Sequence, residues 1–308
     1  MKRVFIGGMG RSGTTITLNA LYQHGELTAI PIETKFLVEA DGFYDLVEAL
    51  TCRFSTAATP VVLERFRDLM RNRVTGLLPS SFSEQHDLSS RIFRNYEEGV
   101  ERLAEILYRR NYFHEREEVL QATRNFIGMT FDDLANISNK PGWVEKTPAN
   151  LWRIEFLREL WPDSFFVHLM RDPRLIFLSL LEKKWLPSEL DAALGVYSDM
   201  TRAMVLKRRT LLGLPRFIEI RLEDLEGDMA ATLGRLASGL DLSPFSADAI
   251  AGIESKVVRY AESKALNPAP IRFSADEAAV INQSMLPFLE ELGYPLQFPA
   301  EALQANPG

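Results

Sequence analysis

The chain has 308 residues, of which 46% are hydrophobic and 25% charged, a composition typical of a globular protein with a large core. Its formal net charge of −7 gives no support to a general nucleic-acid binder or a binder of anionic membranes, because such proteins carry a basic balance or stripe. Cys52 is the only cysteine, which excludes an intrachain disulfide. No signal peptide and no apolar run of about 18 residues is recognisable, so we expect a cytoplasmic protein without a membrane span.

The chain opens with a strand, a glycine-rich loop and a helix. Residues 4–6 are apolar and predict a buried strand, four glycines follow between positions 7 and 13, and residues 14–21 predict a helix. Glycines let the backbone turn tightly, so that successive N–H groups point at an anion over the positive end of the helix. The sequence therefore predicts a phosphate-binding loop.

This loop departs from the Walker pattern G-x-x-x-x-G-K-[ST] at one informative place. Gly8 and Gly13 have the required spacing, but Thr14 stands where nucleotide kinases and ATPases have lysine. The cation has moved into the loop, as Arg11. We therefore expect the loop to bind a phosphate-like group without the lysine that reaches the β- and γ-phosphates of a nucleoside triphosphate.

The middle of the chain shows only helical patterns. We expect helices at about 35–50, 61–74, 96–110 and 115–126, with a loop rich in Ser and Pro at 78–90. Residues from about 36 to 135 contain no recognisable strand. They are predicted to form a helical insertion or cap within a single domain that covers residues 1–308.

Strands and helices alternate again after the middle region. We expect strands at 143–144, 164–170 and 216–220, and helices at 147–160, 173–184 and 190–212. Ser274 and Glu277 form a capping box for a last helix, which ends near Gly293. This alternation predicts an α/β fold with a central parallel sheet covered by helices on both faces.

A second anion site is predicted at the carboxyl end of the strand at 164–170. Arg171 follows this strand, where open α/β sheets bind ligands, and Ser179 lies eight positions, about two helical turns, further on. An arginine and a hydroxyl at this place suit a phosphate separate from the one at the glycine loop. 3′-Phosphoadenosine 5′-phosphosulfate (PAPS) carries two such anions and has no γ-phosphate for magnesium to bridge.

With these features the chain resembles the P-loop sulfotransferases, which have a three-layer P-loop fold. In motif pattern it is closest to the tyrosylprotein sulfotransferases and related bacterial enzymes. The segments that carry the resemblance are GRSGTT at 10–15, Glu-Thr-Lys at 33–35, EKTP at 145–148, RDPRLIFLS at 171–179 and RLEDL at 221–225.

The resemblance implies a set of roles. Glu33 would be the general base, and Lys146 and Arg11 would stabilise the charge of the leaving group. The donor PAPS would be bound by Gly10, Arg11, Ser12, Gly13, Thr14, Thr15, Arg171 and Ser179. The reaction would move the sulfuryl group to a hydroxyl or amine of a small-molecule, glycan, lipid or peptide acceptor. It would release 3′-phosphoadenosine 5′-phosphate (PAP) and need no metal.

Two other functions stay open at this point. One is a P-loop kinase that has shifted its lysine, against which stand Thr14 and the lack of a clear Walker-B strand ending in Asp. The other is a non-catalytic nucleotide-binding module, against which stand the retained Lys146 and Glu33. A protein metal site is poorly supported, because the four histidines and one cysteine form no close pair.

Individual residues also have simpler interpretations. Lys146 would merely pair with Glu145 on the surface if it lay outside a site. Asp172 is expected to cap a helix rather than to act in catalysis, and His168 is expected to be a core histidine because it lies in the middle of an apolar strand.

Overall fold

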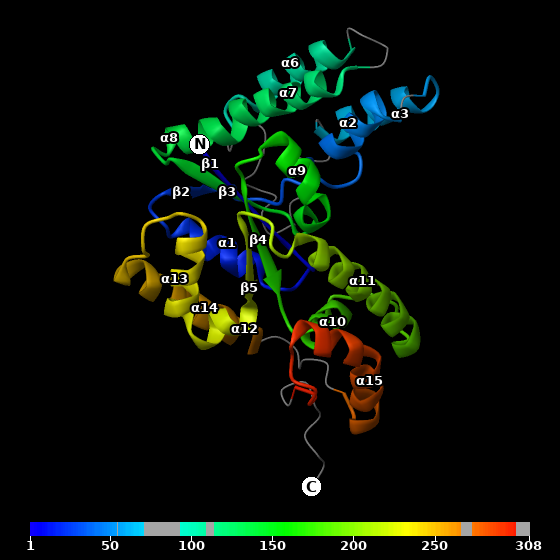
Figure 1. The fold of residues 1–308 in the computed structure, drawn as a ribbon, viewed down its shortest axis with the longest axis vertical. Coiled ribbons are helices and arrows are strands. Elements are labelled where there is room, and N and C mark those ends of the chain that lie inside the picture. Colours follow the sequence, from blue (N-terminus) through cyan, green and yellow to red (C-terminus); the bar gives the residue numbers. More distant parts are fainter. Residues whose placement is uncertain (54, 71–92, 109–113, 266–272, 300–308) are drawn as a thin grey trace. The chain divides into compact units, whose positions relative to one another are not determined.

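A computed structural model describes residues 1–53, 55–70, 93–108, 114–265 and 273–299 (Figure 1). In chain order the elements are β1 (Lys2–Gly8), α1 (Thr14–Tyr22), β2 (Leu27–Ala29), α2 (Phe43–Thr51), α3 (Ala58–Asp68), α6 (Tyr96–Tyr108), α7 (Arg116–Ile127), the π-helix η3 (Gly128–Asp132), α8 (Asp133–Ile137), β3 (Gly142–Lys146), the 3₁₀-helix η4 (Pro148–Arg153), α9 (Ile154–Leu160), β4 (Phe165–Met170), α10 (Pro173–Glu182), α11 (Leu190–Leu211), β5 (Phe217–Arg221), α12 (Leu222–Gly227), α13 (Met229–Gly239), α14 (Ala247–Ala265) and α15 (Ala275–Leu292). The described residues between successive strands always include helix, which confirms the expected α/β class.

The five strands form one sheet in the order β2-β3-β1-β4-β5. Both β1 and β2 pair with β3 in parallel, and Ile6 of β1 lies opposite Lys146 of β3. Every residue of β3 and β4 is buried, as expected for strands whose two faces are both covered. Strand β2 is the one that the sequence did not predict, since three residues are too few to show a periodicity.

The chain divides into two compact units. The first comprises Met1–Gly7 and Leu18–Phe166, and the second comprises Gly8–Thr17 and Val167–Gly308. In the first unit, the described residues between β2 and β3 contain only helices and connecting turns, and the Ser- and Pro-rich loop predicted at 78–90 lies outside the described residues. Side chains of Phe36, Phe43 and Phe126 pack there ring against ring.

In the second unit the predicted boundaries of the last helix are confirmed by its caps. The hydroxyl of Ser274 accepts from the backbone N–H of Glu277, whose carboxylate accepts from the backbone N–H of Ser274, so the capping box is complete. Helix α15 ends at Gly293, which is left-handed with φ 68°. Its apolar face packs on α11.

A partly buried charge cluster joins β4 to β5 and α11. His168 is 2% exposed, as expected for a core histidine, and its Nδ1 lies 3.1 Å from Oε2 of Glu219. Arg208 binds the same carboxylate through two hydrogen bonds of 2.7 Å. Burial by itself raises the pKa of the Glu219 carboxyl, but the hydrogen bonds and charges of His168 and Arg208 outweigh it and hold this pKa at about 2.

Replacing this carboxylate should destabilise the protein in a pH-dependent way. The folded-state pKa is below the unfolded value, so the stabilisation is complete above the unfolded pKa and is lost as the pH falls towards 2. For Glu219→Gln we expect a loss of about 1–3 kcal/mol in the free energy of unfolding at neutral pH, measured by urea denaturation, and a clearly smaller loss near pH 3.

The control is Glu291→Gln, which removes a carboxylate from an exposed bidentate pair with Arg209. This variant should change stability little at either pH. An equal destabilisation by Glu219→Gln at neutral and acidic pH would contradict the assignment of the low pKa to Glu219.

Candidate functional site

The glycine loop leaves β1 with the geometry of an anion cradle. Gly8 has φ 154°, and a Cβ atom at this position would lie 2.6 Å from the carbonyl oxygen of Leu169, so only glycine fits. Helix α1 begins at Thr14, and the N–H of Thr17 donates to the carbonyl of Gly13 at 3.1 Å. This is the first bond of the helix, so the N–H groups of residues 13–16 have no intrahelical acceptor.

Side chains of the loop add to this cradle. Ser12 is fully buried, and its Oγ has no hydrogen-bond partner among the described residues. A buried hydroxyl without a partner is costly and marks a place where a ligand or water completes the hydrogen bonding. Thr14 is also buried, Gly10 and Gly13 are half-buried, and Thr15 is exposed on the first turn of α1. The loop thus offers backbone and hydroxyl donors at the positive end of a helix.

The three residues predicted to bind the two anions form one cluster. Nε of Arg11 donates to Oγ of Ser179 at 3.0 Å, and Nη1 of Arg171 donates to the backbone carbonyl of Arg11 at 3.2 Å. Arg11 has a left-handed backbone with φ 72°, which is strained for a residue other than glycine. The hydrogen bond from Arg171 holds this conformation. The sequence predicted two separate sites, whereas the structure links their side chains directly.

Helix α10 is firmly anchored beside Arg171. The carboxylate of Asp172 accepts from the backbone N–H of Arg174 at 2.9 Å, which confirms Asp172 as the helix cap. The guanidinium of Arg174 is 1% exposed and binds both oxygens of Asp172 and the carbonyls of Pro295 and Gln297. The sequence did not predict this anchor, because Pro295 and Gln297 lie far from Arg174 along the chain.

The end of β3 carries the second pair of predicted residues. Nζ of Lys146 lies 2.5 Å from Oε1 of Glu33, in the segment after β2. The Lys146 side chain is 7% exposed and that of Glu33 is 34% exposed, so the lysine is buried behind a carboxylate that reaches solvent. The ion pair between these two residues was not predicted from the sequence. The simpler interpretation, a surface pair between Lys146 and Glu145, is wrong, because Glu145 is fully buried and has other partners.

Glu145 was not predicted as a functional residue. Its carboxylate accepts hydrogen bonds from the hydroxyls of Thr34 and Thr147 and from the side-chain amide of Asn150, at 2.6–2.9 Å. Burial raises the pKa of the Glu145 carboxyl, and these hydrogen bonds oppose the increase. Thr147 occupies the N-cap position of η4, but its hydroxyl makes no cap and donates to Glu145 instead.

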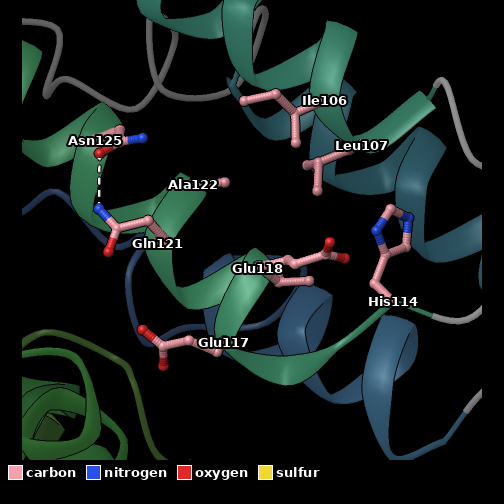
Figure 2. A pocket seen from close by; sticks show the side chains of 9 residues that line it. Ile106, Leu107, His114, Glu117, Glu118, Gln121, Ala122 and Asn125 are labelled. Carbon is pink, nitrogen blue, oxygen red and sulfur yellow. Dashed lines mark hydrogen bonds between the residues drawn. The ribbon is translucent and has the colours of Figure 1, made fainter.

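A pocket of about 570 Å³ lies between α6 and α7, outside the predicted site residues (Figure 2). Ile106 and Leu107 line it from α6, and Glu118 points into it from α7 on the side of His114. Arg116, at the start of α7, is bound to Glu159 and Glu48, and those carboxylates raise its pKa further.

Among the described residues, no three His, Cys, Asp or Glu side chains gather to hold a metal ion. None of the helices in the described part of the chain combines the length and the apolar character needed to cross a membrane.

Comparisons with known proteins find bacterial sulfotransferases. An omega-hydroxy-beta-dihydromenaquinone-9 sulfotransferase, Stf3, from Mycobacterium bovis is 25% identical over 171 residues, and the Stf3 of Mycobacterium tuberculosis matches equally. The match covers 52% of this chain but only 43% of those relatives, so the chain spans less than half of their length. The crystal structure of sulfotransferase STF9 from Mycobacterium avium aligns over 97% of this chain and 78% of its own, with 15% identity and a TM-score of 0.49.

The family model covers most of the chain. The model described as the sulfotransferase family matches residues 3–247, which include the glycine loop, Glu33, Lys146, Arg171 and Ser179. The match extends over far more than half of the sequence, and the chain therefore belongs to the sulfotransferase family.

Proposed function

We propose that this protein transfers the sulfuryl group of PAPS to a hydroxyl or amine of an acceptor. The observation that carries the proposal is the cluster of Arg11, Ser179 and Arg171 on a glycine loop that has Thr14 in place of the Walker lysine. Such a loop can hold an anion through N–H groups and arginines without a magnesium-bridged triphosphate.

The donor would be bound at two points. Gly10, Ser12, Gly13, Thr14 and Thr15 would surround the 5′-phosphosulfate, and the buried Ser12 hydroxyl would gain the partner that it lacks among the described residues. Arg171 and Ser179 would hold the 3′-phosphate. Because Arg11 bonds to Ser179, its guanidinium can lie between the two anions and contribute to both.

The chemistry would be an in-line displacement at sulfur. A bond forms between the acceptor atom and sulfur while the bond from sulfur to the bridging oxygen of the 5′-phosphate breaks, and PAP leaves. Glu33 would take the proton of the acceptor as the new bond forms. Lys146 and Arg11 would stabilise the negative charge that develops on the leaving phosphate.

Glu33 and Lys146 suit these roles by position and environment. The carboxylate of Glu33 is one-third exposed, so an acceptor can reach it, while Lys146 is almost fully buried, where a positive charge acts more strongly than in water. Lys146 lies opposite Ile6, two residues before the loop begins at Gly8. We therefore propose that both compact units contribute to one sulfotransferase domain, with the helices between β2 and β3 as its insertion.

The acceptor is proposed only as a class. The curated relatives are named for a menaquinone with an omega-hydroxyl group, which makes an alcohol the first acceptor class to test. A small-molecule, glycan, lipid or peptide hydroxyl is compatible with the pair of Glu33 and Lys146. The cytoplasm is the proposed compartment, in keeping with a single cysteine in the chain.

Loss of the arginine at the end of β4 should weaken the binding of PAP. Arg171→Ala removes a charged donor to the 3′-phosphate, and we expect a Kd for PAP about 10- to 100-fold higher in calorimetric titrations. The Kd for adenosine 5′-phosphate, which has no 3′-phosphate, should change much less.

The control for this experiment is Arg235→Ala, which removes an exposed arginine paired with Asp224 in the same unit. It should leave both dissociation constants unchanged. If Arg171→Ala weakened the two nucleotides equally, Arg171 would only shape the loop through the carbonyl of Arg11 and would not hold the 3′-phosphate.

Disruption of the pair at the end of β3 should slow transfer rather than binding. Lys146→Ala is expected to lower kcat by about 10²–10³-fold with a modest change in the Kd for PAP, because the lysine acts on charge that develops in the transition state. Glu33→Gln should lower kcat by about 10²–10⁴-fold through loss of the base. Both are measured as sulfuryl transfer from PAPS to an alcohol.

Glu64→Gln serves as the matched control, since it neutralises an exposed carboxylate on α3 in the same unit. Wild-type turnover in Lys146→Ala would remove its catalytic assignment. Unchanged activity of Glu33→Gln across the pH range would remove Glu33 as the base.

A further inference from the structure

The buried carboxylate of Glu145 joins two segments that are far apart in the sequence. Its Oε1 accepts from Oγ1 of Thr34 at 2.9 Å and, at the longer distance of 3.4 Å, from the backbone N–H of the same residue. Oγ1 of Thr147 donates to this oxygen at 2.6 Å, and Asn150 donates to the other oxygen at 2.7 Å. Thr34 and Thr147 are themselves 2% and 0% exposed, so the whole network is sealed from solvent.

A buried carboxylate is costly, so its retention needs a reason. Desolvation raises the pKa of the Glu145 carboxyl, and the donors from Thr34, Thr147 and Asn150 make up for the lost water. Fully satisfied networks of this kind fix one arrangement of the groups that they connect, because every alternative leaves a buried polar atom without a partner. Here the network connects Thr34 and Glu145, which are the sequence neighbours of the proposed catalytic residues Glu33 and Lys146.

The network and the pair hold the same two segments. Thr34 follows Glu33 directly, and Glu145 directly precedes Lys146. Successive side chains of a strand point to opposite faces, so Glu145 and Lys146 leave the end of β3 on opposite sides. The segment at 33–34 is thus held twice, by Thr34 on Glu145 and by Glu33 on Lys146.

We propose that Glu145 is a positioning residue, which uses its hydrogen bonds to Thr34 to hold Glu33 against Lys146 in the geometry that transfer requires. This inference rests on the proposed function of Glu33 and Lys146. Neither Glu145 nor Thr34 touches the substrates. They act through the placement of Glu33, whose carboxylate is one-third exposed. Without the network, Glu33 would lie in a loop next to a half-exposed Ile32 and an exposed Pro31.

The physical effect of the network is on turnover. A general base that is misplaced by about 1 Å can cost up to about 100-fold in rate, while the donor site on the other compact unit keeps its contacts. Weakening the network should therefore lower kcat and leave the Kd for PAP unchanged. A purely structural role would instead reduce stability without separating these two quantities.

The test uses Thr34, because Glu145→Ala would leave three buried donors unpaired and would risk unfolding the protein. Thr34→Val removes the hydroxyl donor and keeps the side-chain shape, whereas Thr34→Ser restores the hydroxyl. Thr123→Val is the matched control, since it removes a fully buried hydroxyl that bonds only within α7, to the carbonyl of Val119.

For Thr34→Val we expect kcat about 10- to 100-fold below wild type, with the Kd for PAP within about twofold, and recovery of most turnover in Thr34→Ser. Transfer from PAPS is followed with an alcohol as acceptor, or with water when a panel of alcohols gives no product. Hydrogen exchange of peptides that cover residues 30–36 should be faster in Thr34→Val than in wild type. Thr123→Val should match wild type in turnover and in exchange at 30–36.

Two results overturn the proposal, and they differ from each other. If wild type transfers sulfuryl groups but Thr34→Val keeps full turnover, or if Thr34→Ser fails to recover it, Glu145 does not position the base through Thr34. If the folded wild type neither binds PAP nor consumes PAPS, the proposed function fails, and the positioning role fails with it.

Discussion

The parallel register of β1 on β3 is the constraint on which the site depends. It places Lys146, which we propose to act on the leaving phosphate, opposite Ile6. Ile6 lies near the end of β1, the strand that precedes the glycine loop. The fit at this edge is close. A Cβ atom on Gly7 would lie 2.6 Å from the backbone nitrogen of Leu151, and Asn150 donates to the carbonyl of Ile6 at 3.0 Å. A shift of one residue would reverse the faces of every side chain on the strand.

In each compact unit, a charged group with many hydrogen bonds lies next to residues for which we propose a role. In the first unit Glu145 is fixed by hydroxyls and an amide, and it borders Lys146. In the second unit the guanidinium of Arg174 connects the start of α10 to the carbonyls of Pro295 and Gln297, which follow α15. Arg174 lies about one helical turn after Arg171. Such buried groups are costly to desolvate and are stable only when all of their partners are present. The side chains next to them, for which we propose roles in binding and catalysis, therefore have little freedom to move.

Much of this was predictable because the signals are local. The glycine loop, the proline after Asp172 and the capping box of Ser274 each specify a backbone geometry within a few residues, and the structure has all three. The roles of Glu33 and Lys146 were expected from a resemblance, but their ion pair was not predicted. Strand β2 was too short to be recognised, and the bond from the hydroxyl of Thr147 to Glu145 depends on the burial of that carboxylate in the folded chain. The contacts of Arg174 could not be predicted from sequence because its partners, among them Asn282, lie far along the chain.

The central proposal is that the glycine loop binds an anionic nucleotide without a Walker lysine. Isothermal titration tests this most directly, with PAP in the presence of a chelator in one series and with ATP, either with the chelator or with excess Mg²⁺ and no chelator, in another. We predict that PAP binds with micromolar or tighter affinity in the absence of Mg²⁺ and that ATP binds far more weakly under both conditions. Binding of ATP that depends on Mg²⁺, together with no binding of PAP, would contradict the account and would indicate a nucleotide kinase instead.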